Sequence, residues 1–213
     1  THFLNGRAIP QENASESRNS RLALMNAATK FVPMLLMPPP GHRFCLYDET
    51  ESNYNFLYLR KILKLAKENR SDVRLFIQPT HVYLLEVLRI LGMEKGYEKW
   101  QKELINVVED INSKYSESRP FPLWNFGGYN SVTMTEVPPS EAANRSMLWY
   151  WDLGHYNKML GDLIQDRIFN FHQPGRLVPE DFGTRINSIN IDLHHNTQKI
   201  KQRQYMKTYP NDI

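Results

Sequence analysis

The chain has 213 residues, of which 41% are hydrophobic and 23% are charged, and its formal net charge is +3. This length suits one α/β domain with extensions, and the composition is that of a globular protein rather than a disordered one. The charge is too small to indicate a nucleic-acid binder, which normally has a concentrated basic face. A transmembrane helix needs about 20 consecutive, mostly apolar residues, and the sequence contains no such run. The single cysteine, Cys45, excludes an internal disulfide.

The first quarter of the chain is predicted to be an extension that contains one helix. Residues 1–12 read as irregular, and the spacing of apolar residues predicts a helix from Asn13 to Val32. The prolines that follow, between positions 33 and 40, exclude regular structure. We therefore expect residues 1–50 to form an irregular and helical N-terminal extension with a Pro-rich connection.

Helices and short apolar strands alternate after this extension. An amphipathic helix is predicted over Glu51–Asn69, and a buried strand over Val73–Ile77. Two more helices follow, of which the first ends at Gly92, and then a brief strand at Leu123–Phe126. This order predicts an α/β domain with a short parallel sheet flanked by helices.

The predicted domain covers residues 51–178, and a C-terminal helical tail covers 179–213, with one helix from about Ser188 to Tyr205. Only two or three strands can be read from the sequence, which is narrow for a parallel sheet because both of its faces must be covered. We expect further strands to come from upstream of Thr1 or from a partner. A sheet with an open edge pairs readily with another strand, so we also expect a homodimer.

An Asp and a His stand three residues apart, at Asp152 and His155, behind the aromatic run Trp149–Trp151, which reads as the end of a strand. In this order the carboxylate can lie on the imidazole, fix its tautomer and stabilise the imidazolium that forms when the ring accepts a proton. The same spacing also fits a helix cap, in which Asp152 accepts hydrogen bonds from backbone amides and His155 is an ordinary first-turn residue. Spacing alone leaves both interpretations open.

Other polar residues follow the predicted strands, where ligands of open α/β sheets bind. They are Thr80, His81, Asn125 and Tyr156. If the segments after the strands converge, these side chains line one crevice together with Asp152 and His155. Structural roles are also open, because Thr80 can cap the next helix and Asn125 can hold a turn.

The sequence does not indicate a metal site. His194 and His195 are adjacent on a predicted helix and therefore point about 100° apart, so the two rings cannot easily share one ion. We expect them to belong to an exposed helix.

The order of several segments resembles part of a known family. The segments are Leu75–His81, Tyr97–Trp100, Leu123–Asn130, Thr135–Pro139, Tyr150–Tyr156, Gly161–Arg167 and Asp181–Arg185. Over roughly residues 50–205 their succession resembles the C-terminal half of bacterial SGNH (GDSL-like) hydrolase-fold proteins of the membrane-anchored, uncharacterised type. The resemblance implies a flavodoxin-like three-layer sandwich, of which this chain would form an incomplete part.

The resemblance also implies a function. Asp152 would be the orienting acid and His155 the general base of a serine esterase or acyl-transfer protein. Members act on ester bonds, commonly of acylated glycans or lipids, and need neither a metal nor an organic cofactor.

The nucleophilic serine of that family follows a buried strand. The residues before Ser20 are too polar for such a strand, so we expect Ser20 to lie in a helix and not to be the nucleophile. We therefore expect the serine and a membrane anchor to lie upstream of this chain, the intact protein to be extracytoplasmic, and the chain alone to be inactive. The alternative is a non-catalytic scaffold or glycan-binding domain of the same fold.

Overall fold

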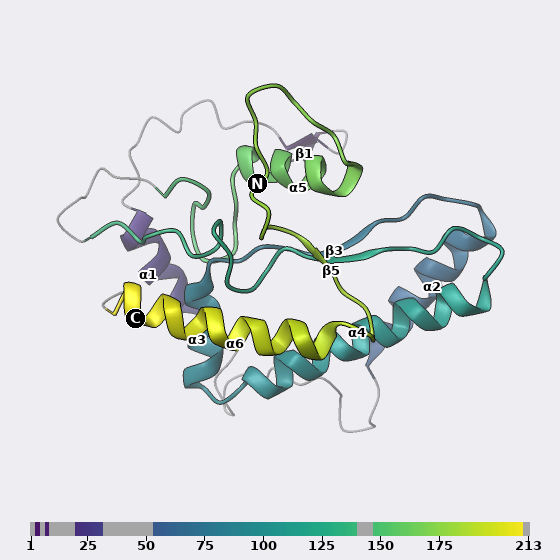
Figure 1. Cartoon of the computed structure of the whole chain (residues 1–213), viewed down its shortest axis with the longest axis horizontal. Coiled ribbons are helices and arrows are strands. Elements are labelled where there is room, and N and C mark those ends of the chain that lie inside the picture. The colour runs from purple at the N-terminus through teal and green to yellow at the C-terminus, as the bar shows by residue number, and fades with distance from the viewer. Residues whose placement is uncertain (1–2, 5–6, 9–19, 32–52, 140–146, 211–213) are drawn as a thin grey trace.

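The computed structural model describes residues 3–4, 7–8, 20–31, 53–139 and 147–210 (Figure 1). Helices and short strands alternate along the chain, which is therefore α/β, as predicted. The elements are β1 (Phe3–Leu4), β2 (Arg7–Ala8), α1 (Ser20–Phe31), α2 (Tyr54–Glu68), β3 (Leu75–Ile77), α3 (Val82–Ile90), α4 (Glu94–Lys114), β4 (Leu123–Asn125), α5 (Lys158–Phe169), β5 (Thr184–Arg185) and α6 (Ile191–Thr208). Residues 13–19 of the predicted first helix, the predicted Pro-rich connection and Cys45 lie outside the described residues.

The main sheet has three strands in the order β3-β4-β5. β3 and β4 are parallel, with Ile77 opposite Asn125, which confirms the parallel pair that the sequence predicts. β5 is antiparallel to β4, with Thr184 opposite Asn125, so the sheet is mixed rather than wholly parallel. The aromatic run 149–151 does not form a third parallel strand, because Tyr150 makes only an isolated antiparallel bridge.

Side chains alternate between the two faces of this sheet, as the pleat requires. Leu123 and Ile77 pack into a cluster with the apolar sides of α2 and α4. Trp124, the residue after Leu123 in β4, points to the opposite face and packs against a second cluster, to which α5 contributes. Helices therefore cover both faces of the sheet.

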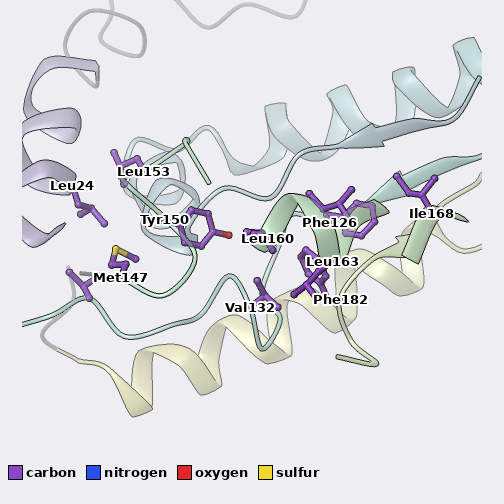
Figure 2. Close-up of a cluster of buried hydrophobic side chains, with 12 residues drawn as sticks. Leu24, Phe126, Val132, Met147, Tyr150, Leu153, Leu160, Leu163, Ile168 and Phe182 are labelled. Carbon is purple, nitrogen blue, oxygen red and sulfur yellow. The ribbon is translucent and has the colours of Figure 1, made fainter. Parts of the chain in front are cut away.

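The second cluster is the one that supports the predicted site. Figure 2 shows it extending from Leu24 of α1 at one end, through Tyr150 and Leu153, to Ile168 of α5 at the other. Phe182, just before β5, is also fully buried in it. Segments from distant parts of the sequence thus share one core.

The ends of the helices follow local capping chemistry. Asn53 caps α2 by accepting a hydrogen bond from the backbone of Phe56 at 3.1 Å, so this helix begins slightly later than predicted. The chain leaves α3 through Gly92, whose φ of 71° is the left-handed conformation that favours glycine. Among the described helices, none combines the length and the apolar composition needed to cross a bilayer.

Candidate functional site

A short hairpin carries the predicted Asp and His. Tyr150 pairs with Tyr156 across it, and the backbone N–H of Trp151 donates to the carbonyl of His155 at 2.9 Å. Residues 152–154 form the tip. Tyr150 is buried in the core while the side chain of His155 is exposed, so the core anchors the hairpin and the tip faces solvent.

The carboxylate of Asp152 lies against the imidazole of His155. Its Oδ2 and Oδ1 atoms are 2.7 and 2.9 Å from Nδ1 of the ring. Oδ1 also accepts the backbone N–H groups of Gly154 and His155, both at 2.9 Å. A carboxylate can only accept these bonds, so Nδ1 of the neutral ring carries the proton and Nε2 carries the lone pair.

The hydrogen bonds around Asp152 keep its carboxyl group ionised. Burial by itself would raise the pKa of this carboxyl, but the hydrogen bonds from the Gly154 backbone and from the ring and backbone of His155 together hold the pKa below its ordinary value. The side chain of Asp152 is 26% exposed, whereas that of His155 is 69% exposed. A negative charge fixed beneath an accessible imidazole stabilises the protonated ring, so this arrangement suits a general base.

The interpretation of Asp152 as a helix cap is wrong. Helix α5 begins at Lys158, and the side chain of Asn157 caps it by accepting from the backbone of Leu160 at 3.1 Å. Asp152 caps the hairpin tip instead. His155 precedes the helix and lies outside its first turn.

His81 lies directly against this hairpin but has no access to solvent. Its backbone N–H donates to the carbonyl of Leu153 at 3.1 Å, and its ring meets that of Tyr150 edge to face, with centroids 5.6 Å apart. His81 therefore links the loop after β3 to the hairpin that holds Asp152 and His155.

Both ring nitrogens of His81 are used inside the protein. Nδ1 accepts from the backbone of Tyr83 at 3.2 Å and so caps α3, and Nε2 donates to the carbonyl of Thr135 at 2.7 Å. Burial lowers the pKa of this histidine to about 4. The expectation that His81 lines an open crevice is therefore corrected, and it is His81 rather than the half-buried Thr80 that caps the helix.

The other two residues predicted to line the crevice also have structural partners. Asn125 is buried: its Oδ1 accepts from the backbone of Gly127 at 2.9 Å, which holds a turn, and its Nδ2 donates to Nε2 of His194 at 3.0 Å. Tyr156 is half-buried in the hairpin pair, and burial raises its pKa. Asn125 is thus directed towards α6, whereas Tyr156 stays with the hairpin.

The loops after β3 and β4 meet at the buried His81, and the hairpin of residues 150–156, which follows no parallel strand, joins them there. Besides the bond from His81 to Leu153, the backbone of Val82 donates to the carbonyl of Thr133 at 3.2 Å. His81 is therefore enclosed by its own loop, by the loop that contains Thr133 and by the hairpin that contains Leu153. The exposed Asp152–His155 pair lies at their outer side.

A cavity between α3, α4 and α6 was missed by the sequence analysis. Tyr97, Gln101, Asn125, His194 and Gln198 are among its lining residues. The sequence signal that could have revealed it is the spacing of polar residues four apart on α6, such as His194 and Gln198, which places them on one face.

His194 and His195 turn inward rather than lying on an exposed helix, which corrects the expectation from sequence. His194 accepts from Asn125, and Nε2 of His195 lies 2.8 Å from Oε1 of Gln101. Burial is the main cause that lowers the pKa of both rings, that of His194 to about 4. In the described part of the chain, no group of three or more metal-ligating side chains is gathered.

Comparison with models of protein families, with curated proteins and with solved structures finds no match to this chain. The Asp152–His155 pair, with its ionised carboxylate and exposed ring, is the part of the described structure best arranged for proton transfer.

Proposed function

We propose that Asp152 and His155 are the acid and the base of a serine-type ester hydrolase or acyl-transfer centre. The observation that carries the proposal is the contact of the Asp152 carboxylate with Nδ1 of His155, at 2.7 and 2.9 Å. It leaves Nε2 as the nitrogen with the lone pair, on a ring that is mostly exposed. The resemblance of the surrounding segments to SGNH-like hydrolases assigns the same roles to the same two residues.

In this chemistry Nε2 of His155 takes the proton of a serine hydroxyl while the serine oxygen attacks the carbonyl carbon of an ester. The ring then returns that proton to the oxygen of the departing alcohol, and an acyl-serine remains. His155 next takes a proton from water or a second alcohol, whose oxygen attacks the acyl carbon, and returns that proton to the serine oxygen as the bond between serine and the acyl group breaks. Asp152 stays ionised throughout and stabilises the imidazolium that forms in each step.

His81 and His194 are the other histidines whose tautomers can be assigned, and in both rings the nitrogen with the lone pair already accepts a hydrogen bond. This difference supports His155 as the base. In His81 the nitrogen with the lone pair accepts from the backbone of Tyr83. In His194 it accepts from the amide of Asn125, whose orientation is fixed because its oxygen accepts from Gly127. The lone pair of His155 has no such use within the described residues.

The proposal requires a serine from elsewhere. Among the described residues, no hydroxyl group is hydrogen-bonded to Nε2 of His155, and Ser20 is the first residue of α1, in a helix as expected. In the proposal the nucleophile is supplied by a segment outside the described residues, and the described part of the chain has no ester-hydrolase activity alone. The substrate is an acylated glycan or lipid.

A non-catalytic domain of the same fold is the second candidate, and one observation favours it. Oδ1 of Asp152 accepts two backbone N–H groups in the hairpin tip, so the carboxylate also has a structural use. Asn at position 152 would keep those two bonds, because its side-chain oxygen can accept them. Asp152→Asn therefore separates the two candidates.

The test is the rate of acetyl-ester hydrolysis by the full-length gene product and three variants. His155→Ala is expected to lower kcat roughly 10⁴-fold or more, and Asp152→Asn by roughly 10²- to 10⁴-fold, because the amide holds the wrong tautomer. His172→Ala, at another exposed histidine, is the control and should change kcat less than about twofold, as is usual for surface substitutions. An active wild type that keeps its rate in His155→Ala would rule out the base assignment.

A further inference from the structure

Trp151 lies directly across the hairpin from His155. The register is set by the Tyr150–Tyr156 pair and by the hydrogen bond from Trp151 N–H to the His155 carbonyl, at 2.9 Å. Directly opposed residues of an antiparallel pair project to the same face, with Cβ atoms about 4.5–5.5 Å apart. Tyr150 points into the core, so the side chains of Trp151 and His155 both point outward.

The indole of Trp151 contributes little to the fold. It is 61% exposed, whereas the neighbours Tyr150 and Leu153 are 1% and 4% exposed and supply the contacts that hold the hairpin to the core. A tryptophan that stays mostly in water forgoes the stabilisation that its large apolar surface could give. Tryptophan is instead enriched at recognition sites, because it offers a rigid apolar face and a polar N–H at low entropic cost.

We propose that Trp151 is a substrate-positioning residue of the Asp152–His155 site, and that its indole face binds the pyranose ring that bears the ester. This inference rests on the proposed function. A pyranose has an apolar C–H face that can lie on an indole, and hydroxyl groups at its rim that remain in water. A ring bound on Trp151 has its substituents beside Nε2 of His155, which is where the ester must lie for proton transfer.

The exposure of Trp151 and His155 favours a sugar ring over a long acyl chain as the group that binds here. An apolar chain gains affinity mainly by leaving water, which requires a closed channel. Trp151 and His155 are 61% and 69% exposed at the tip of a hairpin. A sugar ring can bind the indole through one of its own flat faces while its other side stays solvated.

The test compares two acetyl esters that differ in the ring, with the full-length gene product. The substrates are methyl 6-O-acetyl-glucopyranoside, which has the ring and its free hydroxyl groups, and glycerol triacetate, which lacks the ring. In Trp151→Ala, KM for the glucoside should rise about tenfold, while kcat/KM for glycerol triacetate should change less than about twofold, because only the former loses a ring contact worth about 1.4 kcal/mol. Trp151→Phe should restore most of the loss, and Leu177→Ala, at another exposed apolar residue, should have no effect.

Equal effects of Trp151→Ala on both esters, or no effect on either, would overturn the proposal. If the wild type hydrolyses neither ester, the proposed function fails, and binding alone decides the role of Trp151. The acetylated glucoside is then titrated against tryptophan fluorescence. A saturable change in the wild type that disappears in Trp151→Phe would support ring binding at Trp151, and an identical response in both proteins would exclude it.

Discussion

The two carboxylate oxygens of Asp152 lie 2.9 and 2.7 Å from Nδ1 of His155, and the ring they hold is exposed at the tip of a hairpin. This relationship fixes which nitrogen of His155 is protonated. The base is thus oriented by a residue three positions earlier, in a turn that the backbone N–H groups of Gly154 and His155 complete. The acid–base pair is therefore a local structure, whereas its position depends on the core beneath it.

The tautomer of His155 can be measured directly. In long-range ¹H–¹⁵N spectra of the neutral ring, His155 should show a protonated Nδ1 and an unprotonated Nε2. Asp152→Asn should shift the ring towards the Nε2–H form, since an amide N–H can donate to Nδ1. The exposed His172 serves as the reference. An Nε2–H tautomer in the wild type would contradict the geometry.

Replacing His81 should destabilise the fold by an amount that depends on which bond is lost. His81→Ala removes the cap of α3 and the donor to the Thr135 carbonyl in a fully buried position, so we expect a loss of about 3–5 kcal/mol in the free energy of unfolding. His81→Asn can keep the cap and should lose about 1–3 kcal/mol. Thr80→Ala, at a half-buried residue that is not the cap, should lose less than about 1 kcal/mol. Urea unfolding measures all three, and equal losses for His81→Ala and Thr80→Ala would contradict this role.

Stability should fall on mild acidification. The pKa of His81 is lowered to about 4 in the folded protein, against an ordinary value of about 6.5. Between these values the unfolded chain binds the proton and the folded chain does not. The contribution of His81 to the free energy of unfolding is therefore fully present above about pH 6.5 and is lost as the pH falls towards 4. The loss per histidine approaches about 1.4 kcal/mol per pH unit.

The measurement is urea unfolding at several pH values across this window. His194, whose pKa is also lowered to about 4, should contribute in the same direction but less, since it is only half-buried. His194→Gln, which keeps an acceptor for Asn125, should make the decline shallower. A free energy of unfolding that is constant from about pH 7 to pH 4.5 would contradict the burial of these rings.

Two glycines with positive φ should respond differently to alanine. Gly92 has φ +71° with no atom within 4 Å of an added Cβ, whereas Gly183 has φ +87° and its Cβ would overlap the ring of Phe126. Gly92→Ala should lose only the conformational energy, about 1–2 kcal/mol, and Gly183→Ala should lose about 1–3 kcal/mol more. Denaturant midpoints of the two variants provide the comparison. Equal midpoints would mean that the backbone at Gly183 does not lie against the ring of Phe126.

The sequence predicted the parts of the fold that depend on local apolar patterns. The strands at Leu75–Ile77 and Leu123–Asn125 and the end of α3 at Gly92 were recognisable because apolar runs and a glycine stop are local features. The first strand is less buried than predicted, since Phe76 is exposed and only Ile77 is buried. Asp152 and His155 also lie in one turn, but their spacing left a helix cap open as well, and the resemblance to SGNH-like hydrolases was what favoured the contact. The parallel pairing followed from the helices between the two strands.

The remaining features depend on long-range contacts. β5 has only two residues, both exposed, so it carries no periodic pattern, and only its pairing with β4 defines it. The sequence predicts a crevice position for His81, because its partner, the carbonyl of Thr135, lies 54 positions away and leaves no local signal. The inward face of α6 was missed because its histidines are satisfied by Asn125 and Gln101, and polar residues on a helix ordinarily indicate a solvated face.

Fluorophosphonate labelling is the decisive test of His155 as the base of a serine-ester centre. The full-length gene product, His155→Ala and the control His172→Ala are treated with the probe, and the labelled peptide is mapped. We expect one labelled serine in the wild type and in His172→Ala, and no label in His155→Ala. Absence of label from the wild type, under conditions in which a serine esterase reacts, would contradict this role of His155, as would a serine labelled equally in His155→Ala.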